Sequence, residues 1–267
     1  MSIQQFLRQA TQQLTTAGIE TARLDVLVLL EDVLGQDRAH LLAHPEQVIA
    51  PNQCTILNKK IVRRQKHEPL AYIRGKAMFY GREFSVNRHV LVPRPETESL
   101  VDLLKKIHLP DPVYIADIGT GSGCLGITAA LELPGCTADL YDVSTSALAI
   151  AKRNAQSHAI KAHCYTQNLL EHIHGHYDAV LANLPYVPDN LPINQAAAFE
   201  PQKALFAGPD GLKLYRTLWQ QLAPTDVRYI ITESFPSQHH ALALLARHAG
   251  YQLERTAVFG QLFSRCI

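Results

Sequence analysis

The chain has 267 residues, of which 47% are hydrophobic, and a formal net charge of +1. This length suggests one large domain or two smaller ones with a substantial core, and the near-neutral charge gives no general argument for nucleic-acid binding. The charge is uneven, because residues 1–90 carry +4 (12 Lys and Arg, 8 Asp and Glu) and residues 91–267 carry −3 (13 and 16). Ordinary scatter or an acidic partner of the amino-terminal part would explain this difference.

The cysteines and the apolar runs bear on the cellular compartment. The five cysteines are odd in number and none forms a C-x-x-C pair, which fits a reducing compartment and no structural zinc. Residues 1–14 lack the apolar core of a signal peptide, and no apolar run approaches the roughly 20 residues of a membrane helix. We therefore expect a cytoplasmic, soluble and monomeric protein with no membrane partner.

The first part of the chain has helical periodicity throughout. Apolar residues recur every three or four positions in segments that we predict as helices: 2–17, 21–34, 38–43 and 51–68. They would form a bundle of four or five helices, assigned as a domain over residues 1–69. Its last helix carries cations that form either a solvated face or a docking surface: Lys59, Lys60, Arg63, Arg64 and Lys66.

The pattern changes over residues 70–92. Glycines separate short segments that are typical of strands: 72–75, 77–81 and 83–87. We predict that residues 70–92 form a β-hairpin linker.

An arginine between two prolines follows the predicted hairpin. Pro93 and Pro95 keep the backbone at Arg94 stiff and extended, and a helix is predicted to follow. An arginine held in this way beside a ligand site can bind an anionic group. The alternative is an ion pair with Glu96 or Glu98.

From residue 113 onward, predicted strands and helices alternate. The strands are 113–117, 138–142, 162–166, 178–183, 228–233, 251–258 and 261–266, and the helices are 124–133, 145–156, 211–222 and 237–249. Alternation of this kind predicts a doubly wound α/β fold with a mostly parallel sheet and helices on both faces. The last two strands have no helix between them and should form an antiparallel pair.

A glycine-rich loop follows the first of these strands. Its candidate ligand-binding residues are Asp117, Gly119, Thr120, Gly121, Ser122 and Gly123. Glycines permit a tight turn and close ligand approach, and the following helix offers free N–H groups at its start. Residues 121–126 match the dinucleotide pattern G-x-G-x-x-G, and Asp142 lies 21 residues after Gly121. However, Gly121 comes four residues after Asp117, and an Asp-x-Gly-x-Gly-x-Gly loop suits S-adenosylmethionine better than a dinucleotide.

Further cofactor-binding residues follow the next two strands. Asp142 ends the second strand, where its carboxylate can accept from both ribose hydroxyls or can cap the following helix. Asn168 and Leu169 follow the third strand. The Asn168 amide oxygen could accept from the adenine amino group while Leu169 covers the ring, unless the asparagine merely forms a turn.

The segment Asn183-Leu184-Pro185-Tyr186 follows the buried strand 178–183. The carboxyl end of such a strand is where ligands bind in an open α/β sheet. An amide nitrogen is a poor nucleophile, but two fixed acceptors can turn it toward an electrophile. Asn183 Oδ1 and the Leu184 carbonyl could be these acceptors, with Tyr186 stacked on the amide and Asn183 also bordering the cofactor. A surface turn is the simpler alternative.

These residues resemble the HemK/PrmC family, the glutamine-N5 methyltransferases of peptide chain release factors. The resemblance covers nearly the whole chain and depends most on segments 93–98 and 199–212, since many methyltransferases share the glycine loop. It implies a helical amino-terminal domain, a hairpin linker, and a Rossmann-like methyltransferase domain over residues 93–267. It also implies that the helical domain and linker dock a release factor, and that Asn183, Leu184 and Tyr186 hold the glutamine of its Gly-Gly-Gln loop. We place Arg94 and Glu200 at the substrate-binding site as well.

The chain departs from this family pattern at several positions. Leu184 replaces the first proline of the usual Asn-Pro-Pro-Tyr, and Asn-Leu-Pro-Tyr also resembles the motif of ribosomal RNA adenine-N6 dimethyltransferases. Asn168 stands where the family usually has aspartate. An adenine-N6 methyltransferase acting on RNA or DNA, a glutamine methyltransferase acting on a ribosomal protein, and a non-catalytic binding protein therefore remain alternatives. The near-neutral charge disfavours nucleic acid as the direct substrate.

The expected reaction is a direct, in-line transfer of a methyl group from sulfonium to amide nitrogen. It needs no metal and no covalent intermediate, and the proton would be lost to water after transfer. Alternating His172, His174 and His176 would suit a metal site on a strand, but Gly175 interrupts them and they lie between predicted strands. We predict that no metal binds.

Overall fold

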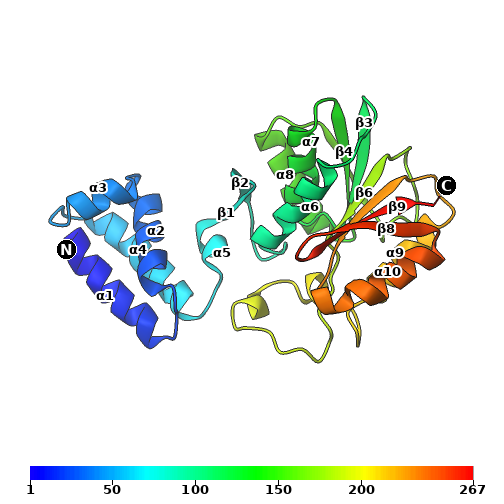
Figure 1. Ribbon diagram of the computed structural model, residues 1–267. Helices are drawn as coiled ribbons and strands as arrows, with labels where there is room; N and C mark the ends of the chain where they lie inside the picture. The colour runs from blue at the N-terminus through cyan, green and yellow to red at the C-terminus, as the bar shows by residue number, and fades with distance from the viewer. Residues whose placement is uncertain (267) are drawn as a thin grey trace. The chain divides into compact units, whose positions relative to one another are not determined.

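The computed structural model describes residues 1–266, which form two compact units (Figure 1). One contains Met1–Gly75 and Ile193–Phe199, and the other contains Lys76–Pro192 and the chain from Glu200 onward. Within the described residues, no helix combines the length and apolar character needed to cross a membrane.

The helical unit contains the predicted bundle. Its helices are α1 (Ile3–Thr16), α2 (Ala22–Leu34), α3 (Arg38–Ala43), α4 (Pro51–Gln65) and α5 (Leu70–Arg74). The start of α1 is fixed by a capping box, in which Ser2 Oγ accepts from the Gln5 N–H and the Gln5 side chain accepts from the Ser2 N–H. The apolar stripes of the predicted helices meet in one buried core that includes Phe6, Leu14 and Leu30.

The prediction of a strand over residues 72–75 is wrong, because this segment belongs to helix α5. Pro69 is the N-cap and Gly75, at φ 80°, is the left-handed C-cap. Tyr72 and Ile73 have high strand propensity, but both are buried in this short helix. The flanking proline and glycine mark a helix here, so local start and stop signals outweigh strand propensity.

Most of the cations in the basic run on α4 form contacts inside the helical unit. Lys60 Nζ donates to the Ile73 carbonyl at 2.8 Å, and Arg63 pairs with Glu68 at 2.5 Å. Arg64 Nε donates at 2.7 Å to Asp25 Oδ2, whose residue is 4% exposed. Three of the five cations therefore stabilise the bundle. The other two, Lys59 and Lys66, have exposed side chains that a docking partner could contact.

The second unit begins with the predicted hairpin. Strands β1 (Lys76–Phe79) and β2 (Arg82–Ser85) pair antiparallel, with Tyr80 (φ 51°) and Gly81 (φ 73°) in the turn. Two successive residues with positive φ are typical of the tight hairpin turn whose twist matches that of the strands.

The prediction of a doubly wound sheet is confirmed. Its strands are β3 (Val113–Ile118), β4 (Cys136–Asp142), β5 (Ala162–Thr166), β6 (Ala179–Ala182), β7 (Tyr229–Glu233), β8 (Tyr251–Thr256) and β9 (Gly260–Arg265). They are ordered β5-β4-β3-β6-β7-β9-β8, with β9 antiparallel to both of its neighbours and the other pairs parallel. Every strand and α-helix from residue 113 begins and ends within two residues of its predicted bounds, whereas the short 3-10 helices Ala197–Phe199 and Gln202–Ala204 were not predicted.

Helices cover both faces of this sheet (Figure 1). Those of one face are α6 (Glu98–Leu104), α7 (Cys124–Glu132) and α8 (Thr145–Ser157), and those of the other are α9 (Lys213–Leu222) and α10 (His239–His248). The strand order reverses direction between β3 and β6, which are hydrogen-bonded neighbours. Ligands bind at such a switch point, outside the carboxyl ends of the strands.

Candidate functional site

A cavity of about 670 Å³ lies at the carboxyl ends of β3, β4 and β6. Twelve of the fifteen residues predicted for the site line it: Arg94, Asp117, Gly119, Thr120, Gly121, Ser122, Asp142, Asn168, Leu169, Asn183, Leu184 and Pro185. The other three, Gly123, Tyr186 and Glu200, do not line it. The structure thus brings the glycine loop and the Asn183 segment to one cavity.

The glycine loop packs closely against the Asn183 segment. A Cβ atom added to Gly119, which has φ 70°, would lie 2.9 Å from Leu184 Cδ2. Asn154 of α8 fixes the loop from behind, because its Nδ2 donates to the Ser122 carbonyl at 2.8 Å and to the Ser85 carbonyl at 3.0 Å. Hydrogen bonds and close packing therefore hold the loop in place.

Asp117 serves mainly to hold the loop together. Its Oδ2 accepts from Thr120 Oγ1 at 2.6 Å and from the Gly126 N–H at 2.9 Å, and the residue is 1% exposed. Burial raises the pKa of this carboxyl to about 6, and the nearby Asp142 charge adds to the rise, whereas the two hydrogen bonds oppose it. The ionised form is therefore costly in the folded state.

The variant Asp117→Asn should reveal this cost as a pH-dependent difference in stability. The folded state holds the Asp117 proton more tightly than the unfolded chain does. This proton therefore stabilises the wild-type folded state fully below about pH 4, and the stabilisation is lost as pH rises through about 6. Asparagine keeps the acceptor oxygen and never ionises. Relative to wild type, the free energy of unfolding of Asp117→Asn should rise by about 2 kcal/mol from pH 4 to 7. Urea denaturation at a series of pH values measures this, and a difference that stays constant with pH would contradict it.

Asp142 joins the glycine loop to the start of α8. Its Oδ2 accepts from the Gly121 N–H at 3.0 Å and its Oδ1 accepts from the Ser144 N–H at 2.8 Å. The N-cap of α8 is Ser144, so the alternative that Asp142 itself caps this helix is wrong. Burial raises the pKa of Asp142. Each carboxylate oxygen keeps a second lone pair, so both can accept from a ligand in the cavity.

Asn168 and Leu169 line the cavity from the loop that follows β5. Leu169 is buried and has φ 52°, a left-handed backbone that costs a non-glycine residue about 1–3 kcal/mol. Gln167 Nε2 supports this conformation by donating to the carbonyls of Leu169 and His172, both at 2.9 Å. Asn168 itself is exposed.

The Asn183 amide has a fixed orientation. Its Nδ2 donates at 2.9 Å to Oγ1 of Thr97, which is 3% exposed and directly precedes α6. With Nδ2 committed to this bond, Oδ1 is the group that Asn183 can offer to a ligand as an acceptor. The nearby Glu233 carboxylate favours this orientation, because the side chains of Thr97 and Asn183 also donate toward it.

Tyr186 does not line the cavity, and its side chain contacts the buried end of β7 and the residues that follow it. Its hydroxyl donates to Glu233 Oε1 at 3.0 Å, and its ring contacts Phe235 edge-on with centroids 4.9 Å apart. Burial raises the pKa of Glu233, the Glu96 charge adds to the rise, and the polar side chains of Thr97, Tyr186 and Asn183 oppose it. Burial and the Glu233 charge likewise raise the pKa of Tyr186, which stays a neutral hydrogen-bond donor.

Gln238 and Gly211 support the backbone at Tyr186. Gln238 Nε2 donates to the carbonyls of Tyr186 and Asp210, both at 2.8 Å. A Cβ atom added to Gly211, which has φ 74°, would lie 2.0 Å from the Tyr186 carbonyl oxygen. The segment 208–212 is therefore a tight support for the Asn183 segment.

Arg94 forms its ion pair with Glu200, so the predicted alternative partners Glu96 and Glu98 are wrong. Arg94 Nη2 lies 2.5 Å from Glu200 Oε1, and Glu200 Oε2 accepts from the Val92 N–H at 3.1 Å. The Glu200 side chain is 2% exposed, whereas that of Arg94 is 36% exposed and lines the cavity. Glu200 therefore holds the proline-flanked segment, and Arg94 remains available to a ligand.

The histidine run makes contacts other than a shared metal site. His174 stacks on Tyr165 with ring centroids 4.2 Å apart, and His176 lies 3.2 Å from Asp226 and 3.4 Å from Asp178. Over residues 1–266 the structure contains no group of three or more His, Cys, Asp or Glu side chains placed to hold a metal ion.

Several supporting residues were not predicted from the sequence: Thr97, Asn154, Gln167, Tyr215, Glu233 and Gln238. Two signals could have found some of them. Thr97 lies inside the 93–98 segment and Asn154 inside the stretch 151–155, both part of the family resemblance.

Two family models and several named relatives match this chain. Residues 5–75 match the model of the PrmC N-terminal domain, and residues 96–199 match that of the methyltransferase small domain. The chain is 40% identical to a release factor glutamine methyltransferase from Coxiella burnetii over 221 residues, 82% of this chain and 79% of the relative. It is 34% identical to a bifunctional methyltransferase from Rickettsia bellii over 81% of this chain, but spans only 45% of that longer protein.

A solved structure supports the fold alone. A methyltransferase from Pyrococcus furiosus matches with a TM-score of 0.52 and 13% identity, over 82% of this chain and 100% of that one. The family is shown by the Coxiella relative, which is 40% identical and covered over 79% of its length: the chain belongs to the release factor glutamine methyltransferase family.

Proposed function

We propose that this protein transfers a methyl group from S-adenosylmethionine to the side-chain amide nitrogen of the glutamine in the Gly-Gly-Gln loop of release factors. The observation that carries the proposal is the Asn183–Thr97 hydrogen bond, which leaves Asn183 Oδ1 as an oriented acceptor at the cavity. The family relationship supports a release factor glutamine as the methyl acceptor, because a Coxiella relative is named for this reaction.

The cavity residues fit S-adenosylmethionine. A volume of about 670 Å³ suits a ligand of this size, since such pockets span about 300–1,000 Å³. Asp142 has acceptor capacity for the ribose hydroxyls, Asn168 and Leu169 would hold the adenine, and loop residues 117–123 would hold the amino-acid part. When bound, the cofactor supplies a methyl group that is already activated by the sulfonium charge.

The chain's own contribution is to position the acceptor amide. Asn183 Oδ1 and the Leu184 carbonyl would accept from the two N–H groups of the glutamine amide and so direct its nitrogen toward the donor. Orientation of this kind can lower a barrier by about 7–11 kcal/mol. The same two oxygens would stabilise the positive charge that grows on the nitrogen, more strongly in a site with little water. Neither oxygen is basic, so the proton is released to water after transfer.

The two parts of the chain would have separate tasks. We assign residues 1–69 as the domain that docks the release factor, residues 70–92 as the linker, and the remainder as the catalytic domain. Arg94, held by Glu200, would contact the acceptor loop at the cavity rim. In this view the protein works as a cytoplasmic monomer and needs no metal.

Transfer from labelled S-adenosylmethionine tests this function. The protein is incubated with a release factor, with the same factor carrying alanine in place of the Gly-Gly-Gln glutamine, with ribosomal RNA, and with ribosomal proteins. We expect the label only in the unaltered factor, on the glutamine identified by peptide mass spectrometry. Equal labelling of the alanine variant would contradict the assigned residue. Label confined to RNA or to a ribosomal protein would instead support one of the alternative acceptors.

A further inference from the structure

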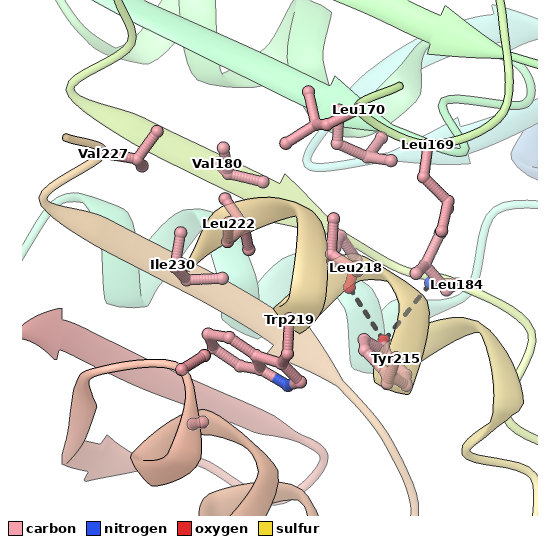
Figure 2. Close-up of a cluster of buried hydrophobic side chains, with 14 of the residues drawn as sticks. Leu169, Leu170, Val180, Leu184, Tyr215, Leu218, Trp219, Leu222, Val227 and Ile230 are labelled. Carbon is pink, nitrogen blue, oxygen red and sulfur yellow. Dashed lines mark hydrogen bonds between the residues drawn. The ribbon is translucent and has the colours of Figure 1, made fainter. Parts of the chain in front are cut away.

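The hydroxyl of Tyr215 is hydrogen-bonded to three parts of the backbone beside the Asn183 segment. It accepts from the Leu184 N–H at 3.3 Å (Figure 2) and lies 3.0 Å from the Ala182 carbonyl and 2.5 Å from the Glu233 carbonyl. Tyr215 belongs to α9, and its residue is 0% exposed. One side chain therefore connects the ends of β6 and β7 with the peptide between Asn183 and Leu184.

The Tyr215 hydroxyl is the hydrogen-bond partner of the buried Leu184 N–H. A phenol has one hydrogen and can accept through its lone pairs, so it donates to one of the two carbonyls at a time while accepting from Leu184. Leu184 is 2% exposed, so its N–H has no access to water. An unpaired N–H at this depth would cost about 1–3 kcal/mol. A proline at this position would carry no N–H, whereas leucine requires a partner here.

The other sides of Leu184 are also fixed. Its side chain packs on Gly119 and belongs to the core cluster drawn in Figure 2. Pro185 restricts the backbone of the preceding residue to extended conformations. With the side chain packed and the following peptide restricted, the Tyr215 bond supplies the remaining constraint, on the amide side of Leu184.

We propose that Tyr215 is a positioning residue, whose hydroxyl fixes the Asn183–Leu184 peptide so that the Leu184 carbonyl is presented to the acceptor amide. This inference rests on the proposed function, since it assigns a task to the carbonyl that would hold the substrate. Tyr215 touches neither substrate nor cofactor. It acts through the backbone of the residue that does.

The variant Tyr215→Phe removes the hydroxyl and keeps the ring, and the matched control is Tyr251→Phe. Tyr251 is also 0% exposed, and its hydroxyl donates to the Val227 carbonyl at 2.9 Å and accepts from Arg265 Nη1 at 3.1 Å. Both variants lose a buried hydroxyl with several partners. Similar losses of stability in urea denaturation would show that they are comparable.

Two measurements then separate positioning from a purely structural role. Amide hydrogen exchange of the Leu184 N–H should become about tenfold faster in Tyr215→Phe and stay unchanged in Tyr251→Phe, because one net hydrogen bond is lost. The kcat for release factor methylation should fall by about 10–100-fold in Tyr215→Phe with KM changed less than about threefold, as expected for an effect on positioning. Unchanged exchange, or a kcat equal to that of the control, would overturn the inference.

A double-mutant comparison gives the sharpest test. In a Leu184→Pro background there is no N–H for Tyr215 to hold, so Tyr215→Phe should lower kcat by less than about threefold there. An equal factor in both backgrounds would show that Tyr215 acts only through the carbonyls of Ala182 and Glu233. If the wild-type protein labels no release factor, the proposed function fails. Faster exchange at Leu184 would then still show that the peptide is held by Tyr215.

Discussion

Replacing Asn183 by alanine is expected to lower the kcat for glutamine methylation by about a hundred- to a thousandfold. The substitution removes one of the two oxygens that would hold the acceptor amide, and the loss of a single preorganised polar group at a reacting centre typically has an effect of this size. The dissociation constant of S-adenosylmethionine should change by less than about threefold, since the glycine loop and Asp142 stay in place. Steady-state kinetics with a release factor and equilibrium binding of the cofactor measure the two effects.

Two other variants separate the orientation of the Asn183 amide from cofactor binding. Thr97→Val keeps Asn183 but removes the hydroxyl that accepts from its Nδ2, so kcat should fall by about tenfold through loss of amide orientation alone. Asn168→Ala lies in the same cavity and should show the opposite pattern, with weaker cofactor binding as its main effect. If Asn183→Ala retains wild-type kcat, the acceptor mechanism is wrong. If it loses cofactor binding as completely as activity, Asn183 belongs to the cofactor site instead.

The part of the site that could be predicted from sequence follows from the rules of parallel sheets. Asp117, Asp142 and Asn183 each lie at or just after the end of a strand, and the carboxyl ends of parallel strands meet at one edge. The glycine loop adds a recognisable spacing. Local patterns were therefore sufficient to place these residues around one cavity before the strand order was known.

The supporting residues could not be predicted in this way, because their partners are distant in sequence. Arg94 and Glu200 are 106 positions apart, and the sequence offered nearer glutamates as partners. Tyr215 occupies an apolar position of an amphipathic helix, where a tyrosine is usually read as core, so nothing marked its hydroxyl. Tyr186 was predicted to stack on the acceptor amide, a role that no contact tests. Its observed hydrogen bond to Glu233 required knowledge of the strand order.

Gly211→Ala is expected to destabilise the protein by about 4 kcal/mol and to reduce methyl transfer. The new methyl group would lie 2.0 Å from the Tyr186 carbonyl oxygen and 2.5 Å from Gln238 Nε2. A backbone carbonyl cannot rotate away as a flexible side chain could, so the Asn183 segment would have to move. Left-handed strain of about 1–2 kcal/mol adds to the cost of overpacking, about 1–3 kcal/mol.

Gly250→Ala separates these two contributions. Gly250 has φ 85°, similar to the 74° of Gly211, but a Cβ atom there would meet nothing within 4 Å. This control should therefore lose only the conformational part, about 1–2 kcal/mol, and keep wild-type kcat. Urea denaturation and release factor methylation, measured for both variants, give the comparison. Equal destabilisation of the two variants would show that the segment around Gly211 can yield to the added methyl group, and that the Tyr186 backbone is not held by close packing at this position.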